Sequence, residues 1–257
     1  MTAHEAAQAI ASRDRSSLYL TSSFFKDRRR YEAFCAHYAL MRVVDDRIDA
    51  LPSRTGLAAR QRTAEHDVVA AWGEGIRSCY HGRPVSKRVA ERCGFPRAAL
   101  LFDALGASLR AFRPHPELWT DFFRAMHWDL DHDRFDSWKE FLTYAEGASV
   151  APTTIYLELI TSRQSGGLPQ DFELFHCGRQ LGTFAYLAHV VRDLSKDLRT
   201  GENGLVYVSR EDMATHGVTE QLLFADAERG RASLGTRRLV CDLLGRAKGF
   251  LSEGRAS

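Results

Sequence analysis

Apolar residues recur every three or four positions along most of this chain, which is the spacing of amphipathic α-helices. Turn signals are sparse, and alanine, leucine and arginine are abundant. Residues 76–96 form the most loop-like stretch, since glycine and proline interrupt the pattern there. The pattern predicts an all-α fold in a single domain spanning 1–257, with helices over 27–50, 56–75, 97–111, 117–133, 137–164 and 171–198 and one or two more after residue 219.

Two local features stand out within the predicted helices. Pro152 interrupts its helix, and an internal proline removes a backbone hydrogen bond and kinks the helix. Gly178, Gly182 and Ala185 follow one stripe of the last long helix. Such small side chains either let a neighbouring helix pack closely or leave room for a ligand, and both interpretations stay open.

Two pairs of aspartates carry most of the information about chemistry: Asp45 with Asp49, and Asp193 with Asp197. A spacing of four residues puts both carboxylates of a pair on one face of a helix. Like charges placed in this way repel by roughly 0.2–0.5 kcal/mol on an exposed helix. A bound cation would offset the repulsion, and hard oxygen ligands point to Mg²⁺.

The aspartate pairs continue stripes of polar side chains that begin one and two turns upstream. These are Tyr38 and Arg42 before the first pair, and Tyr186 and His189 before the second. A buried network of ion pairs is the alternative interpretation of such stripes. Asp129 and Asp133 share the four-residue spacing, but they lie in a strongly polar run, so we expect them on a solvated helix face.

Three segments together resemble one family of enzymes. Ser16–Tyr19 with Arg30–Asp49 is similar to the first signature of the squalene and phytoene synthases, Gly178–Asp197 to the second, and Trp128–Gly147 to the segment that enters the central cavity helix. Order and spacing agree from about residue 12 to residue 208. The resemblance implies an isoprenoid-synthase fold, a helical bundle whose two aspartate pairs face each other across a central cavity.

The resemblance also implies a reaction. Members bind two prenyl diphosphates, such as farnesyl or geranylgeranyl diphosphate, through Mg²⁺ and join them head to head as diphosphate leaves. Carried over by residue, Asp45, Asp49, Asp193 and Asp197 are the expected metal ligands. The expected substrate-binding and closing residues are Ser16, Tyr38, Arg42, Tyr186, His189, Arg192 and Tyr207. Asp46 points about 100° away from Asp45, so we expect it to pair with a neighbouring side chain.

The chain departs from the family pattern in several ways. Tyr186 and His189 stand where the family usually carries glutamine and asparagine, and the sequence ends about 50 residues after Tyr207, sooner than is typical. The shorter C-terminal region predicts a more open cavity or one that a partner chain completes. Two alternatives therefore stay open: prenyl transfer to a non-isoprenoid acceptor, and a non-catalytic binding or assembly protein that keeps the fold.

The composition limits the kinds of partner and the cellular compartment that we expect for this protein. A net charge of +2 gives no case for nucleic-acid binding. The five cysteines have no close spacing resembling a zinc site, and their odd number argues against a complete disulfide set, which favours a reducing cytoplasm. No stretch of the sequence approaches 18 uninterrupted apolar residues, and no apolar signal region begins it. We expect a cytoplasmic protein, with peripheral membrane contact left open because its expected substrates carry long hydrocarbon chains.

Overall fold

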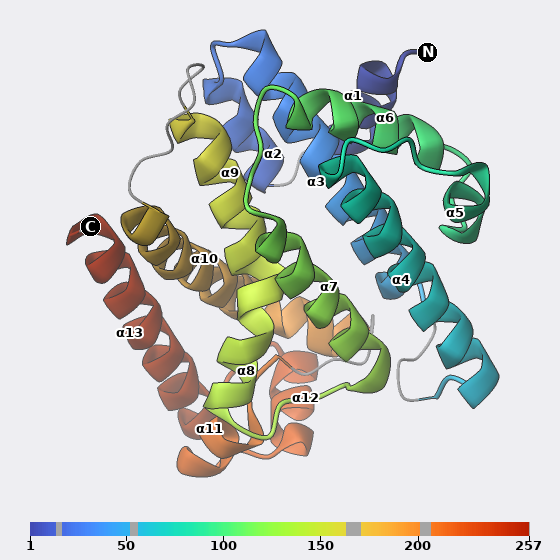
Figure 1. Ribbon diagram of the computed structural model, residues 1–257. Coiled ribbons are helices and arrows are strands. Elements are labelled where there is room, and N and C mark those ends of the chain that lie inside the picture. The colour runs from blue at the N-terminus through green and yellow to red at the C-terminus, as the bar shows by residue number, and fades with distance from the viewer. Residues whose placement is uncertain (14–16, 52–55, 163–170, 201–206, 257) are drawn as a thin grey trace.

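The protein is built from helices alone in the part of the chain that the computed structural model describes (Figure 1). The described residues are 1–13, 17–51, 56–162, 171–200 and 207–256. The chain is 79% helical, which confirms the predicted all-α fold. Within this part of the chain, each helix is too short or too polar to cross a bilayer.

The long helices follow the predicted segments closely. In chain order the elements are α1 (Ala3–Ala11), α2 (Ser17–Thr21), η1 (Ser22–Phe24), α3 (Arg28–Asp49), α4 (Ala59–Tyr80), α5 (Lys87–Arg92), α6 (Ala98–Leu109), α7 (Pro116–Asp131), α8 (Trp138–Ala145), η2 (Glu146–Val150), α9 (Ala151–Thr161), α10 (Asp171–Thr200), α11 (Arg210–Thr215), α12 (Glu220–Arg229) and α13 (Leu234–Ala256). The prediction of a loop over 76–96 is wrong in part, because α4 continues to Tyr80 and α5 forms within that range.

Short helices start at side-chain caps. Thr2 and Glu5 form a reciprocal capping box at α1, in which each side chain accepts a hydrogen bond from the other residue's backbone N–H. Ser86, Ser137 and Ser209 cap α5, α8 and α11 in the simpler way, each accepting from a backbone N–H three residues on. These caps stabilise helices that are too short to persist alone.

The helices pack so that α7 and the continuous α8–η2–α9 segment lie at the middle of the molecule (Figure 1). The first motif helix, α3, packs on α1, α6 and α9, whereas the second, α10, packs on α13 and α9. Buried side chains from α1 to α13 join in one hydrophobic cluster, in which Trp72, Phe135 and Phe141 are the largest of the fully buried side chains. The central segment therefore separates and positions the two motif helices.

Pro152 lies directly after a π-helical turn, η2, and within the first turn of α9. The helical path continues through this irregularity, so the proline widens one turn instead of ending the helix. Ser149 in the π turn donates a hydrogen bond to the backbone carbonyl of Gly182 on α10 (2.9 Å). Thr154 donates to the Val150 carbonyl of its own helical segment (2.8 Å).

The glycine stripe of α10 serves close packing of two helices. A Cβ atom at Gly178 would lie 2.1 Å from Thr154 Oγ1, and one at Gly182 would lie 2.7 Å from Val150 Cα. Both distances are far below van der Waals contact, so side chains there would force α10 away from η2 and α9. At these two positions the structure decides between the two interpretations in favour of helix packing.

Replacing Gly182 by alanine is expected to lower the free energy of unfolding by about 1–3 kcal/mol, because the methyl group meets backbone atoms of Val150. Gly249→Ala on α13 is the matched control, since a Cβ there meets nothing within 4 Å. That change is expected to stabilise by up to about 1 kcal/mol through helix propensity. Urea denaturation of both variants measures the difference, and equal stability would contradict the packing argument.

Candidate active site

The first aspartate pair lies at the C-terminal end of α3. Asp49 is the last residue of the helix, and the side chains of Asp45 and Asp49 are exposed. Between them, Asp46 accepts a hydrogen bond from Arg42 Nε at 3.0 Å, as expected for a pairing residue. Its other carboxylate oxygen lies 3.8 Å from Arg13 Nη1. The amphipathic pattern of α3 therefore buries the apolar face and leaves Asp45 and Asp49 toward solvent.

The second aspartate pair lies near the C-terminal end of α10, which ends at Thr200. Arg192 donates two hydrogen bonds to Asp193, from Nε to Oδ1 at 2.8 Å and from Nη2 to Oδ2 at 2.5 Å. This contact holds the pKa of the Asp193 carboxyl below its ordinary value, so the group is ionised at neutral pH. Asp197 is half-buried one turn further on.

His189 lies one turn before Asp193 on the same helix. Loss of solvent around the ring lowers the pKa of His189, and the positive charge of Arg192 lowers it further, while Asp193 opposes the shift. The imidazole is therefore neutral at pH 7. In that state it offers one hydrogen-bond donor and one acceptor to a ligand, much as the family's usual asparagine does.

An aromatic cluster lies beside the second motif helix, α10. The ring of Tyr186 on α10 stacks on Phe141 (centroids 5.5 Å apart) and meets Tyr207 edge to face (6.0 Å). Burial holds the pKa of Tyr186 well above its usual range, and negative charge at Tyr207, Asp129 and Asp45 adds to the effect. Asp45, on α3, makes the smallest of these contributions.

The expectation of a solvated face at Asp129 is wrong. Its side chain is 2% exposed, and its Oδ2 accepts a hydrogen bond from the Tyr144 hydroxyl at 3.0 Å. Asp133 lies beyond the end of α7 and pairs with Arg134 at 3.2 Å. The sequence did contain a signal for Asp129, because the position falls on the buried stripe of α7 that includes Phe122.

The remaining candidate residues divide between these helices and the chain after α10. Tyr38, on α3, stacks on Phe34 with centroids 5.4 Å apart and is half-buried. Tyr207 is half-buried against Tyr186. Ser16 lies outside the described residues. Sequence reasoning assigned no role to Tyr144 or Phe141, although both lie in the aromatic cluster beside the second motif.

The positions of the aspartates suit a hard cation. Asp49 and Asp197 lie in the last turn of their helices, where unpaired carbonyl groups and the helix dipole already make the potential negative. Among the described residues, no group of three or more His, Cys, Asp or Glu side chains is arranged to enclose a metal ion by itself. Mg²⁺ does not require such a cage, because it commonly takes one or two carboxylates and fills its octahedron with water and substrate phosphate. The donor set fits that mode.

The sequence model described as squalene/phytoene synthase matches residues 11–257. The chain belongs to the squalene/phytoene synthase family. Membership makes the protein a prenyltransferase of the squalene/phytoene synthase type, and the family's general reaction is head-to-head isoprenoid condensation. Comparison with curated proteins finds no match.

Two solved structures share the fold of this squalene/phytoene synthase family member. A dehydrosqualene synthase in complex with a ligand aligns with a TM-score of 0.75 and 19% identity, over 98% of this chain and 75% of the other. Squalene synthase HpnC from Alicyclobacillus acidocaldarius aligns with a TM-score of 0.74 and 21% identity, over 99% and 82%. The shared architecture is the all-α isoprenoid-synthase fold that the sequence predicts.

Proposed function

We propose that this protein is an Mg²⁺-dependent prenyltransferase that condenses two isoprenoid diphosphates head to head and releases diphosphate. The observation that carries the proposal is that α3 and α10 each place two aspartates one turn apart in their C-terminal halves, with an arginine bonded to a neighbouring carboxylate on each helix. Family membership supports the class of reaction. The residue roles below are part of the proposal.

Asp45, Asp49, Asp193 and Asp197 hold the metal in this proposal. Bound Mg²⁺ supplies Lewis-acid stabilisation of the negative charge that collects on a departing diphosphate. Arg42 and Arg192 bind diphosphate oxygens, for which the guanidinium fork is well matched. Both arginines already contact motif carboxylates, so substrate binding adds anionic partners to cations that are positioned in advance.

The aromatic cluster has a separate role. Loss of diphosphate leaves an allylic cation, which water would quench before it met a second substrate. Tyr186, Tyr207, Phe141 and Tyr144 put ring faces and edges next to the second motif. Ring faces stabilise a cation electrostatically while excluding water. His189, neutral at pH 7, orients diphosphate by hydrogen bonding without adding charge.

The proposal is tested by incubating the purified chain with C15 and C20 prenyl diphosphates and Mg²⁺, followed by mass analysis of the organic extract. We expect diphosphate release and a product with two prenyl chains, and no product when EDTA removes the metal. Release of diphosphate with a product of one chain only would overturn head-to-head condensation. Absence of binding and turnover with both substrates would support the non-catalytic alternative.

A second candidate is prenyl transfer to a non-isoprenoid acceptor. Tyr186 and His189, which replace the family's usual glutamine and asparagine, favour it because they reshape the surface beside the second aspartate pair. The same incubation with a set of small aromatic acceptors separates the two functions. A prenylated acceptor, without a coupled prenyl dimer, identifies the second.

A further inference from the structure

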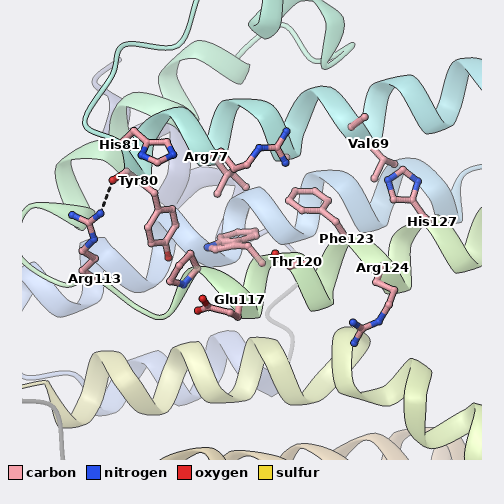
Figure 2. Close-up of a pocket in the computed structure, with 15 residues that line it drawn as sticks. Val69, Arg77, Tyr80, His81, Arg113, Glu117, Thr120, Phe123, Arg124 and His127 are labelled. Carbon is pink, nitrogen blue, oxygen red and sulfur yellow. Dashed lines mark hydrogen bonds between the residues drawn. The ribbon is translucent and has the colours of Figure 1, made fainter. Parts of the chain in front are cut away.

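A groove of about 700 Å³ lies between α4 and α7 (Figure 2). Its lining comes from residues 69–81 and 113–127. Among the described residues, no side chain of α3 or α10 lines it. Its volume falls within the roughly 300–1,000 Å³ of pockets that hold small ligands.

The floor of the groove is apolar and aromatic. Val69 and Ile76 from α4 face Trp119 and Phe123 from α7. A Cβ at Gly73 would lie 3.5 Å from Arg77 Nη1 and 3.6 Å from the Phe123 ring, so a larger side chain there would fill the trough. A hydrocarbon chain laid along this floor would leave water and gain roughly 0.8 kcal/mol for each buried CH₂ group.

Three arginines make the rim of the groove cationic, whereas His127 is neutral because burial lowers its pKa. Figure 2 shows Arg113 and His81 at one end, Arg77 above the middle, and Arg124 and His127 at the other end. Glu117 is the one acidic side chain among the described residues of the lining. The groove therefore combines an apolar floor with a net positive edge.

The three arginines differ in the hydrogen bonds and ion pairs that their guanidinium groups already make. Arg113 donates to the Tyr80 carbonyl at 2.6 Å, and Arg124 pairs with Asp121 at 2.9 Å. Arg77 is an exposed residue that makes no hydrogen bond or ion pair with a described residue, and its Nη1 lies 3.5 Å from where a Cβ of Gly73 would be. Its five N–H donors are available to a phosphate or another oxyanion, which makes Arg77 the group best placed to bind an anionic head.

We propose that this groove is a binding site for a single-chain amphipathic phosphate, with the hydrocarbon chain on the Trp119–Phe123 floor and the phosphate at Arg77. A peptide helix is about 10–12 Å across, so a partner helix of several turns would need a larger trough. One chain of about 15 carbons fits the volume. The inference does not rest on the reaction proposed above, because the groove shares no lining with the motif helices.

The probe for the test is farnesyl phosphate, titrated calorimetrically into the full chain in EDTA so that metal-dependent binding at the aspartates is absent. We expect saturable binding at one site. Inorganic phosphate, which lacks the chain, and farnesol, which lacks the charge, are each expected to bind at least about tenfold more weakly. Equal binding of farnesol would overturn the role of the rim.

Two substitutions locate the site. Gly73→Leu fills the trough and is expected to abolish binding, whereas Gly245→Leu on α13, at a position with nothing within 4 Å of its Cβ, keeps it. Arg77→Glu is expected to weaken binding at least tenfold. Arg60→Glu, on the exposed start of α4, changes net charge equally and leaves affinity unchanged.

Two results would overturn the proposal. One is unchanged affinity in both Gly73→Leu and Arg77→Glu. The other is loss of binding in Asp193→Asn, which would place the probe at the motif helices instead. If Gly73→Leu does not fold, Arg77→Glu and a photoreactive farnesyl phosphate decide the question, because crosslinks must map to peptides of α4 or α7. Crosslinks confined to α3 or α10 would count against the groove, whatever the outcome of the prenyltransferase assay.

Discussion

Replacing either Asp45 or Asp193 by asparagine is expected to slow diphosphate release by at least about a hundredfold. Asparagine keeps the size of the side chain but removes the negative charge that the proposed metal requires. Because each aspartate belongs to a different helix, both single variants are expected to be impaired, with the Mg²⁺ concentration for half-maximal rate shifted upward. Steady-state assays across a Mg²⁺ series measure both effects.

Asp103→Asn on α6 is the control, since it removes an exposed carboxylate from outside the motifs. Its rate and Mg²⁺ dependence are expected to match those of the unsubstituted protein. Thermal unfolding establishes that the motif variants are folded, because their aspartates lie largely on solvated helix ends. Undiminished turnover in both motif variants would contradict the proposed metal site and favour the non-catalytic alternative.

Replacing His37 by phenylalanine is expected to make the protein markedly less sensitive to acid. His37 is 1% exposed on α3, stacks on Trp119 with centroids 5.8 Å apart, and has no hydrogen-bond partner for either ring nitrogen among the described residues. Burial lowers the pKa of His37 from 6.5 to about 3. A phenyl ring keeps the stacking and removes two unsatisfied polar atoms, which is expected to stabilise by roughly 1–3 kcal/mol at pH 7.

The sign of the pH effect follows from proton binding. Because the folded pKa is the lower one, the unfolded chain takes up the proton first as pH falls below 6.5. Stability is fully present above that pH and is lost at roughly 1.4 kcal/mol per pH unit down to about 3.

Urea denaturation at pH 7.5 and pH 5 should therefore show about 2 kcal/mol less acid destabilisation in His37→Phe. His176→Phe, an exposed change on α10, should keep the original dependence. An unchanged pH dependence in His37→Phe would show that the ring is protonated or solvated in the folded state.

Helical periodicity was sufficient to locate the long helices. The predicted range 97–111 corresponds to α6, and 171–198 corresponds to α10, because apolar positions repeat over several turns in each. The short helices α1, α5 and α11 were missed, since six to nine residues give too few turns for a periodic signal. Their caps, such as Thr2 with Glu5, are local signals that an analysis of hydrophobic periodicity does not use.

The candidate site was only partly accessible from sequence. The spacing of the aspartates identified one face on each helix, and family resemblance related the two helices. The hydrogen bond from Tyr144 to Asp129 and the contact of Tyr186 with Phe141 were not predictable, because they depend on how α7, α8 and α10 pack. The groove between α4 and α7 was missed for the same reason, because the sequence of each helix does not show how the two helices pack against each other.

The two hydrogen bonds from Arg192 to Asp193 affect the electrostatics of α10 before any ligand binds. Two carboxylates one turn apart on an exposed helix repel each other by roughly 0.2–0.5 kcal/mol, and the Arg192 guanidinium offsets this repulsion at Asp193. In the proposed metal site, this arginine would serve as the counter-charge whenever the ion is absent. In the proposed reaction, substrate binding would exchange part of the Arg192–Asp193 contact for hydrogen bonds between Arg192 and the phosphate oxygens.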